Sequence, residues 1–176
     1  MKKLICVLLI LVLACSLVAC SDDDTPDGMQ NVSTENALFN LYVPASWISQ
    51  TASGVSGARV SNTDASNVTV TTYLPEADMS VTEYWEKVCL PSYRDGGVLQ
   101  SFTLIEGSCK DTSLGGKGAK QYVFTYVLDG VTYESMQIIT VASDMMVYTL
   151  TYTAAADKYA EHLESVESIR AEFRFR

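Results

Sequence analysis

The sequence predicts an α+β domain, in which a central antiparallel sheet of about six or seven strands is packed by helices. Three observations lead to this fold class. Apolar and polar residues alternate along many short segments, most of these segments are joined by turn-like residues, and two other segments have helical spacing. Strands, a helix, more strands and a last helix, joined mostly by hairpins, are typical of an antiparallel sheet covered by helices.

The first strands are predicted before the first helix. Residues 38–47 ("LFNLYVPASW") alternate and then break at Pro44, which indicates a strand that ends in a turn. The segments "GARVSN" and "NVTVTTYL" predict a hairpin around Asp64, with its valines on one face and its threonines on the other.

The first helix is predicted from Ser80. Ser80 and Glu83 have the spacing of a capping box, and apolar residues follow at helical spacing up to Cys89. Pro91 is expected to end or kink this helix near Leu90, because proline removes a hydrogen bond and its ring clashes with the preceding turn.

The second half of the chain predicts more strands and a closing helix. Asp129-Gly130 is a strong two-residue hairpin signal, and Ser143-Asp144 indicates another turn. The expected extended segments are 99–109, 120–128, 131–141 and 145–153. A last helix fits residues 157–170, where apolar side chains recur at helical spacing.

The N-terminus has the pattern of an export signal. Lys2 and Lys3 precede an apolar or small run over residues 4–19, which is shorter than the roughly 20 residues that span a bilayer. The run ends in "LVAC" at Cys20, which resembles the lipobox of bacterial lipoproteins. This resemblance implies that residues 1–19 are a signal peptide and that a diacylglycerol is attached to the thiol of Cys20.

This pattern predicts a membrane-anchored protein of the bacterial cell envelope, outside the cytoplasm. The alternatives are an uncleaved signal anchor or an ordinary secretory signal cut elsewhere. Residues 20–36 are predicted to be the lipidated cysteine and a disordered acidic tether, because residues 21–36 are polar and almost without large apolar groups. Such a tether could extend about 50 Å. The folded domain is then expected over residues 37–176.

Net charge excludes some partners. Ten of the 12 lysines and arginines and all 21 acidic residues follow residue 19, so the processed chain carries a charge of −11. This charge argues against nucleic acid as a partner and against docking flat on anionic lipid. We expect contact with the membrane through the N-terminal lipid, and an unknown protein or small molecule as partner.

Cys89 and Cys109 are the only cysteines after Cys20. In an exported domain, two such thiols either form a disulfide or stay free and buried as small hydrophobic side chains. Spacing alone leaves both alternatives open.

Several segments resemble the PsbP-like domains, a fold that also occurs in a yeast Ran-binding import factor and in DcrB-type bacterial lipoproteins. The segments are "VPASW", "SVTEYWEKV", "LGGKGAKQYVFTY" and "VYTLTYTAAADKYAEHLESVESI". The resemblance covers residues 38–175 and implies a PsbP-like α/β/α sandwich. Members of this family serve as accessory or binding proteins, and the resemblance transfers no functional residue.

No residue set predicts catalysis or a metal site. His162 is the only histidine, and the sequence places no serine or thiol beside it, so it is interpreted as a helix-surface residue. The segment "LGGKGAK" departs from the P-loop pattern and is interpreted as a flexible turn. We expect no cofactor and no metal.

A row of threonines is the candidate binding face. It is expected to lie on the other face of the sheet from Tyr148, Leu150 and Tyr152. This face is either an ordinary solvent-exposed sheet surface or a surface that holds a ligand or partner. The row consists of Thr69, Thr71, Thr125, Thr149 and Thr151.

The leading hypothesis is therefore a lipid-anchored extracytoplasmic accessory or binding domain. One alternative is a thiol-dependent or hydrolytic enzyme that uses Cys89 or Cys109. Another alternative is a structural spacer of the envelope, without a specific partner.

Overall fold

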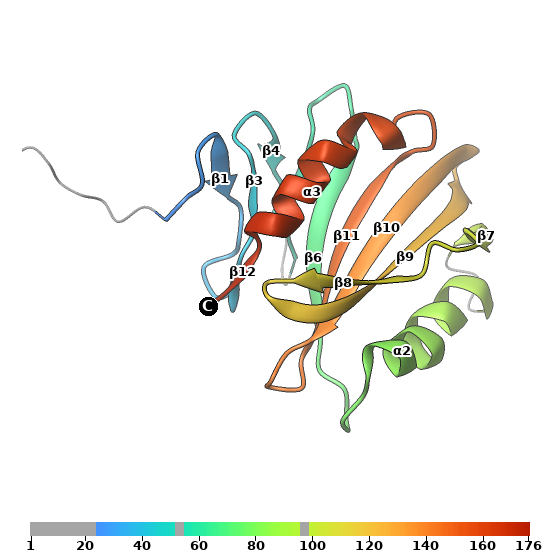
Figure 1. Cartoon of the computed structure of the whole chain (residues 1–176). Coiled ribbons are helices and arrows are strands. Elements are labelled where there is room, and N and C mark those ends of the chain that lie inside the picture. Colours follow the sequence, from blue (N-terminus) through green and yellow to red (C-terminus); the bar gives the residue numbers. More distant parts are fainter. Residues whose placement is uncertain (1–23, 52–54, 96–98) are drawn as a thin grey trace, which may run out of the picture.

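A computed structural model describes residues 24–51, 55–95 and 99–176, and shows the predicted α+β architecture (Figure 1). An antiparallel sheet of eight strands runs in the order β4-β5-β6-β11-β10-β9-β7, and β8 also pairs with β9. The strands of this sheet are β4 (Ile48–Ser49), β5 (Ser56–Arg59), β6 (Asn67–Tyr73), β7 (Gln100–Leu104), β8 (Lys110–Leu114), β9 (Lys117–Leu128), β10 (Val131–Val141) and β11 (Val147–Ala155).

The central strands are joined by the hairpins that the sequence predicts. Asp129 and Gly130 both have positive φ angles, 51° and 79°, which is the geometry of the tight turns that join antiparallel strands. β9 begins at Lys117, because Gly115 and Gly116 also have positive φ and form a second tight hairpin. The flexible turn predicted for "LGGKGAK" is therefore an ordered turn between β8 and β9, and β8 itself was not predicted.

Two small strand pairs close the N-terminal side of the domain. β1 (Met29–Asn31) pairs with β3 (Tyr42–Pro44), and β2 (Phe39–Asn40) pairs with β12 (Arg174–Phe175).

The predicted tether over residues 20–36 is too long, because β1 belongs to the fold and Val32 is only 3% exposed. The physical reason is that β1 is held through its backbone, and a polar composition does not reveal such pairing. Residues 20–23 lie outside the described residues.

The first helical segment continues past Pro91, so of the two expected effects of the proline an end near Leu90 is wrong. α2 (Val81–Tyr84) begins with the predicted capping box between Ser80 and Glu83, and is followed by the π-helical turns η1 (Trp85–Cys89) and η2 (Pro91–Asp95). The amide of Leu90 donates to the carbonyl of Trp85, five residues back. The wider π turn accommodates the proline ring, which would clash with the carbonyl four residues back in a regular α-helix.

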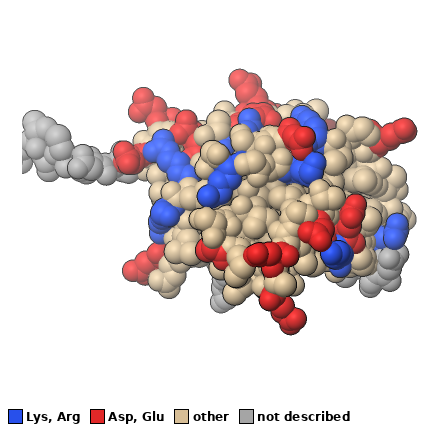
Figure 2. Space-filling view, turned by 60° about the horizontal axis from the view of Figure 1, so that its bottom comes forward, with Lys and Arg blue, Asp and Glu red and all other residues tan. Residues whose placement is uncertain are grey.

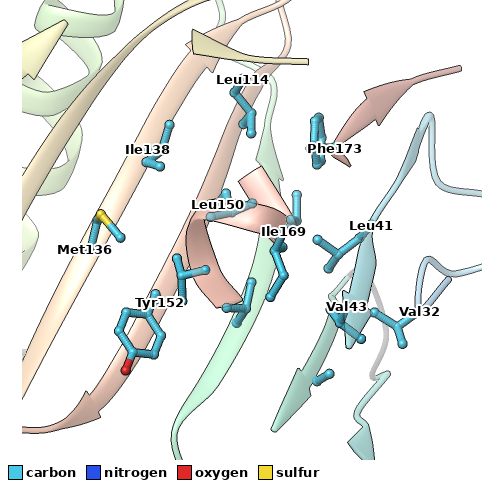
Figure 3. Packing of buried hydrophobic residues seen from close by; sticks show 14 of the residues in the cluster. Val32, Leu41, Val43, Leu114, Met136, Ile138, Leu150, Tyr152, Ile169 and Phe173 are labelled. Carbon is cyan, nitrogen blue, oxygen red and sulfur yellow. The ribbon is translucent and has the colours of Figure 1, made fainter. Parts of the chain in front are cut away.

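Helical segments pack against both faces of the sheet. On one face, the closing helix α3 (Leu163–Glu172), preceded by the 3-10 turn η3 (Tyr159–His162), buries Ile169 against Leu150 and Ile138. Figure 3 shows these side chains in one apolar layer with Leu41, the residue directly before β3. On the other face, Trp85 of η1 packs parallel to the ring of Tyr122, with 4.0 Å between ring centroids. The α/β/α sandwich is confirmed.

Candidate functional site

Four of the five predicted threonines share one face of the sheet. β11 pairs Thr149 with Thr71 and Thr151 with Thr69 on β6, which puts all four side chains on the same side. Their neighbours Tyr148, Leu150 and Tyr152 belong to the core under α3. The threonine face, as we call it, is therefore Thr69, Thr71, Thr149 and Thr151, on the side that α2, η1 and η2 partly cover.

The inclusion of Thr125 in this row was wrong. Thr125 pairs with Glu134 on β10, whereas Ser135, Gln137 and Ile139 are the β10 residues that face the threonines. Side chains alternate between the two faces, so a difference of one position in register reverses the face. Thr125 consequently lies on the opposite side of the sheet, where it is half-buried.

Exposure differs along the threonine face. Thr71 is exposed, Thr69 and Thr151 are half-buried, and Thr149 is only 5% exposed. The phenol of Tyr84 in α2 lies close to the side chain of Thr149, so the helical segment covers this end of the face. The open part of the face is formed by Thr69, Thr71 and Thr151.

A buried glutamine lies beside the open part. The register places Gly57, Thr69, Thr151 and Gln137 next to one another across four strands. The Nε2 amide of Gln137 donates to the hydroxyl of Tyr93 over 2.8 Å, whereas its Oε1 has no hydrogen-bond partner, although Gln137 is only 7% exposed. Buried polar atoms are nearly always paired, so this acceptor is an exception that needs an explanation.

Tyr93 contacts this glutamine from the helical side, and it belongs to an apolar cluster with Cys89 and Tyr84. Burial raises the pKa of the Cys89 thiol to about 11 and that of the Tyr93 phenol to about 12. The thiol of Cys89 lies close to the side chains of Tyr84 and Tyr93. A thiol with a raised pKa stays protonated at neutral pH and is a weak nucleophile, so this environment does not favour thiol chemistry at Cys89.

The structure places the two cysteines in different environments. Cys89 is buried and Cys109 is exposed, and both are free thiols. The described structure therefore has no disulfide between them, and the alternative of two buried free thiols holds for Cys89 but not for Cys109.

Cys89 and Tyr93 come from the π-helical turns η1 and η2. π-helical turns are rare and are often found at functional sites, because the extra residue in the turn changes the direction of a side chain. The sequence offers one indirect signal of this geometry, which is Pro91 within an otherwise helical pattern.

His162 lies in a polar cluster that the sequence did not reveal. Its Nε2 lies 2.9 Å from Oδ2 of Asp64, in the loop between β5 and β6, and the two side chains are 17% and 20% exposed. Hydrogen bonds from Ser66 and a weaker one from His162 lower the pKa of Asp64 to about 2. His162 is thus a half-buried residue at the start of α3, and the interpretation as a helix-surface histidine is corrected.

The same cluster contains possible metal ligands. One ligand atom each from Asp64, Glu161 and His162 lies within 4.8 Å of the others. Glu161, however, is exposed and forms an ion pair of 2.9 Å with Lys158. Its carboxylate is therefore already neutralised by a neighbouring cation.

A groove of about 750 Å³ lies on the α3 side of the sheet. It is formed between residues 34–39 and the ends of β6 and β11, and its lining includes Thr34, Phe39, Thr72 and Tyr148. The sequence could not predict this groove, since one of its walls belongs to the segment that was interpreted as a tether.

The architecture of the described residues is similar to that of solved PsbP-like structures. No model of a known protein family and no curated protein matches the sequence. Among solved structures, cyanobacterial PsbP (CyanoP) from Synechocystis is similar, with a TM-score of 0.63 and 14% identity over 91% of this chain and 99% of that chain.

Two further solved structures share the fold. LpqN of Mycobacterium tuberculosis, described as involved in cell envelope biogenesis, has a TM-score of 0.55 and 16% identity over 83% of this chain and 89% of that chain. The protein Mog1 has a TM-score of 0.57 and 9% identity over 84% of this chain and 95% of that chain. At these identities the likeness concerns the fold, so the resemblance to PsbP-like domains is confirmed at that level.

None of the helices in the described ranges is long and apolar enough to cross a membrane. Cys20 lies outside these ranges, so its lipidation stays a prediction from the sequence.

Proposed function

We propose that this protein is a lipid-anchored accessory domain of a bacterial cell envelope, which binds a partner through the threonine face. The observation that carries the proposal is the buried Oε1 of Gln137, which has no hydrogen-bond partner and belongs to the residue that pairs with Thr151 in the sheet. The partner is a protein or a small polar molecule, and it contributes at least one hydrogen-bond donor.

The energetic argument rests on the cost of an unpaired acceptor. A buried polar atom without a partner costs about 1–3 kcal/mol, and a ligand that supplies a donor recovers this energy. The neighbouring hydroxyls of Thr69 and Thr151 both donate and accept, so they suit an amide or hydroxyl group of a ligand. Binding sites typically combine an apolar, aromatic lining with a few such polar groups, and here Gln137 is bonded to the aromatic residue Tyr93.

Attachment to the envelope is supported by the N-terminal pattern. The lysines at positions 2 and 3, the apolar run and Cys20 are the features of a lipoprotein signal. Two acyl chains on one residue give a firm anchor, and a domain held at a membrane reaches partners there even with modest affinity. LpqN, which shares the fold, is described as involved in cell envelope biogenesis, which agrees with this location.

The anchor is tested by Cys20→Ala. This substitution should abolish lipidation and prevent cleavage before residue 20, because the thiol is the acceptor of the lipid. Mass spectrometry of the N-terminus and partitioning into detergent measure both effects. A variant that keeps the N-terminal mass of the wild type and still enters the detergent phase contradicts the anchor.

The binding face is tested by Thr71→Lys together with Thr151→Lys. Both side chains are accessible, whereas the buried Thr149 would not accept a lysine without loss of folding. The double variant should capture less partner in cells after crosslinking, at an unchanged melting temperature. Thr125→Lys is the matched control, because Thr125 is equally half-buried but lies on the other face of the sheet.

Three outcomes separate the hypotheses. Reduced capture by the double variant alone supports the threonine face. Unchanged capture by a folded double variant excludes this face. A complete absence of partners for the wild-type protein favours the alternative of a structural spacer.

A further inference from the structure

The folded domain starts close to the proposed anchor. The first described residue, Asp24, already contacts the domain, because its carbonyl accepts a hydrogen bond of 3.3 Å from Nη1 of Arg174. Four residue steps separate Asp24 from Cys20, so this stretch of chain spans at most about 15 Å. A lipid on Cys20 would therefore hold the surface around Arg174 near the bilayer, and not at the end of a long tether.

This surface carries an unusual share of the positive charge. Segments 110–120 and 167–176 contain six lysines and arginines and three acidic residues, a net charge of +3, in a processed chain of charge −11. Figure 2 shows blue side chains beside the place where the N-terminal chain leaves the domain, with red side chains around them. The mean charge of the protein therefore does not describe this end.

The two basic segments pack against each other. Nη1 of Arg170 donates to the carbonyl of Ser113 over 3.1 Å, and Nζ of Lys117 lies 5.4 Å from the ring centroid of Phe175. The turn of β8 and β9 touches β12 so closely that a Cβ at Gly115 would lie 2.6 Å from the ring of Phe175. The basic end, as we call it, comprises Lys117, Arg170, Arg174 and Arg176.

Carboxylates offset only part of this charge. Arg170 and Arg174 form ion pairs with Glu167 and Glu172, and the carboxylate of Asp24 is a further negative charge near Arg174. The guanidinium of Arg176 donates hydrogen bonds to neutral oxygens, which are Oδ1 of Asn40 and the carbonyls of residues 35 and 37. Lys117 lies against an aromatic ring, so the charges of Lys117 and Arg176 remain available to anions in solvent.

We propose that the basic end binds the phosphate groups of anionic phospholipids in the membrane that holds the anchor, and so fixes the orientation of the domain. This inference rests on the proposed anchor at Cys20. Cations near an anionic bilayer are attracted over about a Debye length, roughly 8 Å at physiological salt, and the short connection keeps the basic end within reach. The acidic remainder of the surface is repelled and turns away from the bilayer.

The experiment uses the mature, lipidated protein in vesicles of phosphatidylcholine, with or without one third phosphatidylglycerol. The readout is the rate at which a water-soluble acylating reagent modifies Lys117, measured by mass spectrometry. Lys87 on η1, across the sheet, is the internal reference. We expect Lys117 to react about fivefold more slowly in the anionic vesicles, an effect that high salt abolishes, while Lys87 reacts equally in both.

A pair of variants completes the test. Arg176→Gln should weaken the protection of Lys117, whereas Arg59→Gln, which removes a cation from the β5 side of the sheet, should not. Melting temperatures exclude unfolding as the cause. Equal modification of Lys117 in both kinds of vesicle overturns this inference, and an N-terminal mass without lipid overturns the proposed anchor instead.

Discussion

Nε2 of His162 lies 2.9 Å from Oδ2 of Asp64, although 98 positions separate the two residues. The contact joins the loop between β5 and β6 to the start of α3, and the indole of Trp47 packs edge-on against the histidine ring. It is a polar connection between the closing helix and the sheet, at the edge of a largely apolar layer.

The pKa of Asp64 leads to a prediction about acid stability. Asp64→Asn should lower the free energy of unfolding by about 1–2 kcal/mol at neutral pH, because hydrogen bonds to an ionised group are lost. The folded-state pKa of about 2 lies below the usual value of 3.8, so this stabilisation is present above about pH 4 and is lost as the pH falls to 2. Urea unfolding of both proteins between pH 7 and pH 2 measures the difference.

The control for this prediction is Asp111→Asn. Asp111 forms an ion pair with Lys120, but its side chain is 87% exposed, and such pairs contribute little. A difference between wild type and Asp64→Asn that stays constant down to pH 2 would contradict the assigned pKa.

The two cysteines are predicted to react very differently. A thiol reagent should modify the exposed Cys109 at once in the folded protein, and the buried Cys89 only after unfolding, because burial both blocks access and keeps its thiol protonated. Peptide mapping after timed alkylation, with and without reductant, gives the two rates. Modification of Cys109 only after reduction would show a disulfide that the structure lacks.

Gly57 is predicted to lose stability when any side chain replaces its hydrogen. A Cβ at this position would lie 2.6 Å from the carbonyl oxygen of Val68 in the neighbouring strand, so the backbone itself would have to move. Gly57→Ala should destabilise the protein by about 1–3 kcal/mol, as overpacking does. Gly118→Ala is the matched strand control, since nothing lies within 4 Å of its Cβ. Equal melting temperatures of the two variants would contradict the close approach of β5 and β6.

Tyr152 is predicted to stabilise the junction between β11 and η3. Its hydroxyl donates to the carbonyl of Tyr159 over 2.8 Å in a buried position. Tyr152→Phe keeps the ring but leaves that carbonyl unpaired, which should cost about 1–3 kcal/mol in chemical denaturation. Tyr73→Phe, at an exposed position, should cost much less. A loss of the same size in both variants would argue against this hydrogen bond.

The sequence predicted the elements that local patterns determine. The capping box at Ser80, the turn at Asp129-Gly130 and the closing helix each depend on residues a few positions apart, and all three are present. Their order along the chain was sufficient for the fold class.

The features that depend on pairing between segments far apart in the chain could not be predicted from the sequence. β1 is held by backbone bonds to β3, and these leave no apolar pattern. Thr125 was assigned to the wrong face, because its register against β10 could not be inferred from spacing. The partner of His162 and the unpaired oxygen of Gln137 likewise follow from contacts between segments far apart in the chain.

The pairing of β2 with β12 has a consequence for how the domain assembles. Phe39 lies opposite Phe175, so the strand near the start of the domain is completed by residues at its far end. Closing a loop of about 136 residues carries a large entropic cost, and contacts between such distant residues slow folding. A ribosome-bound chain that still lacks residues 173–175 would expose the rings of Phe39 and Tyr148, and we expect this domain to reach its native state only after these residues have left the ribosome.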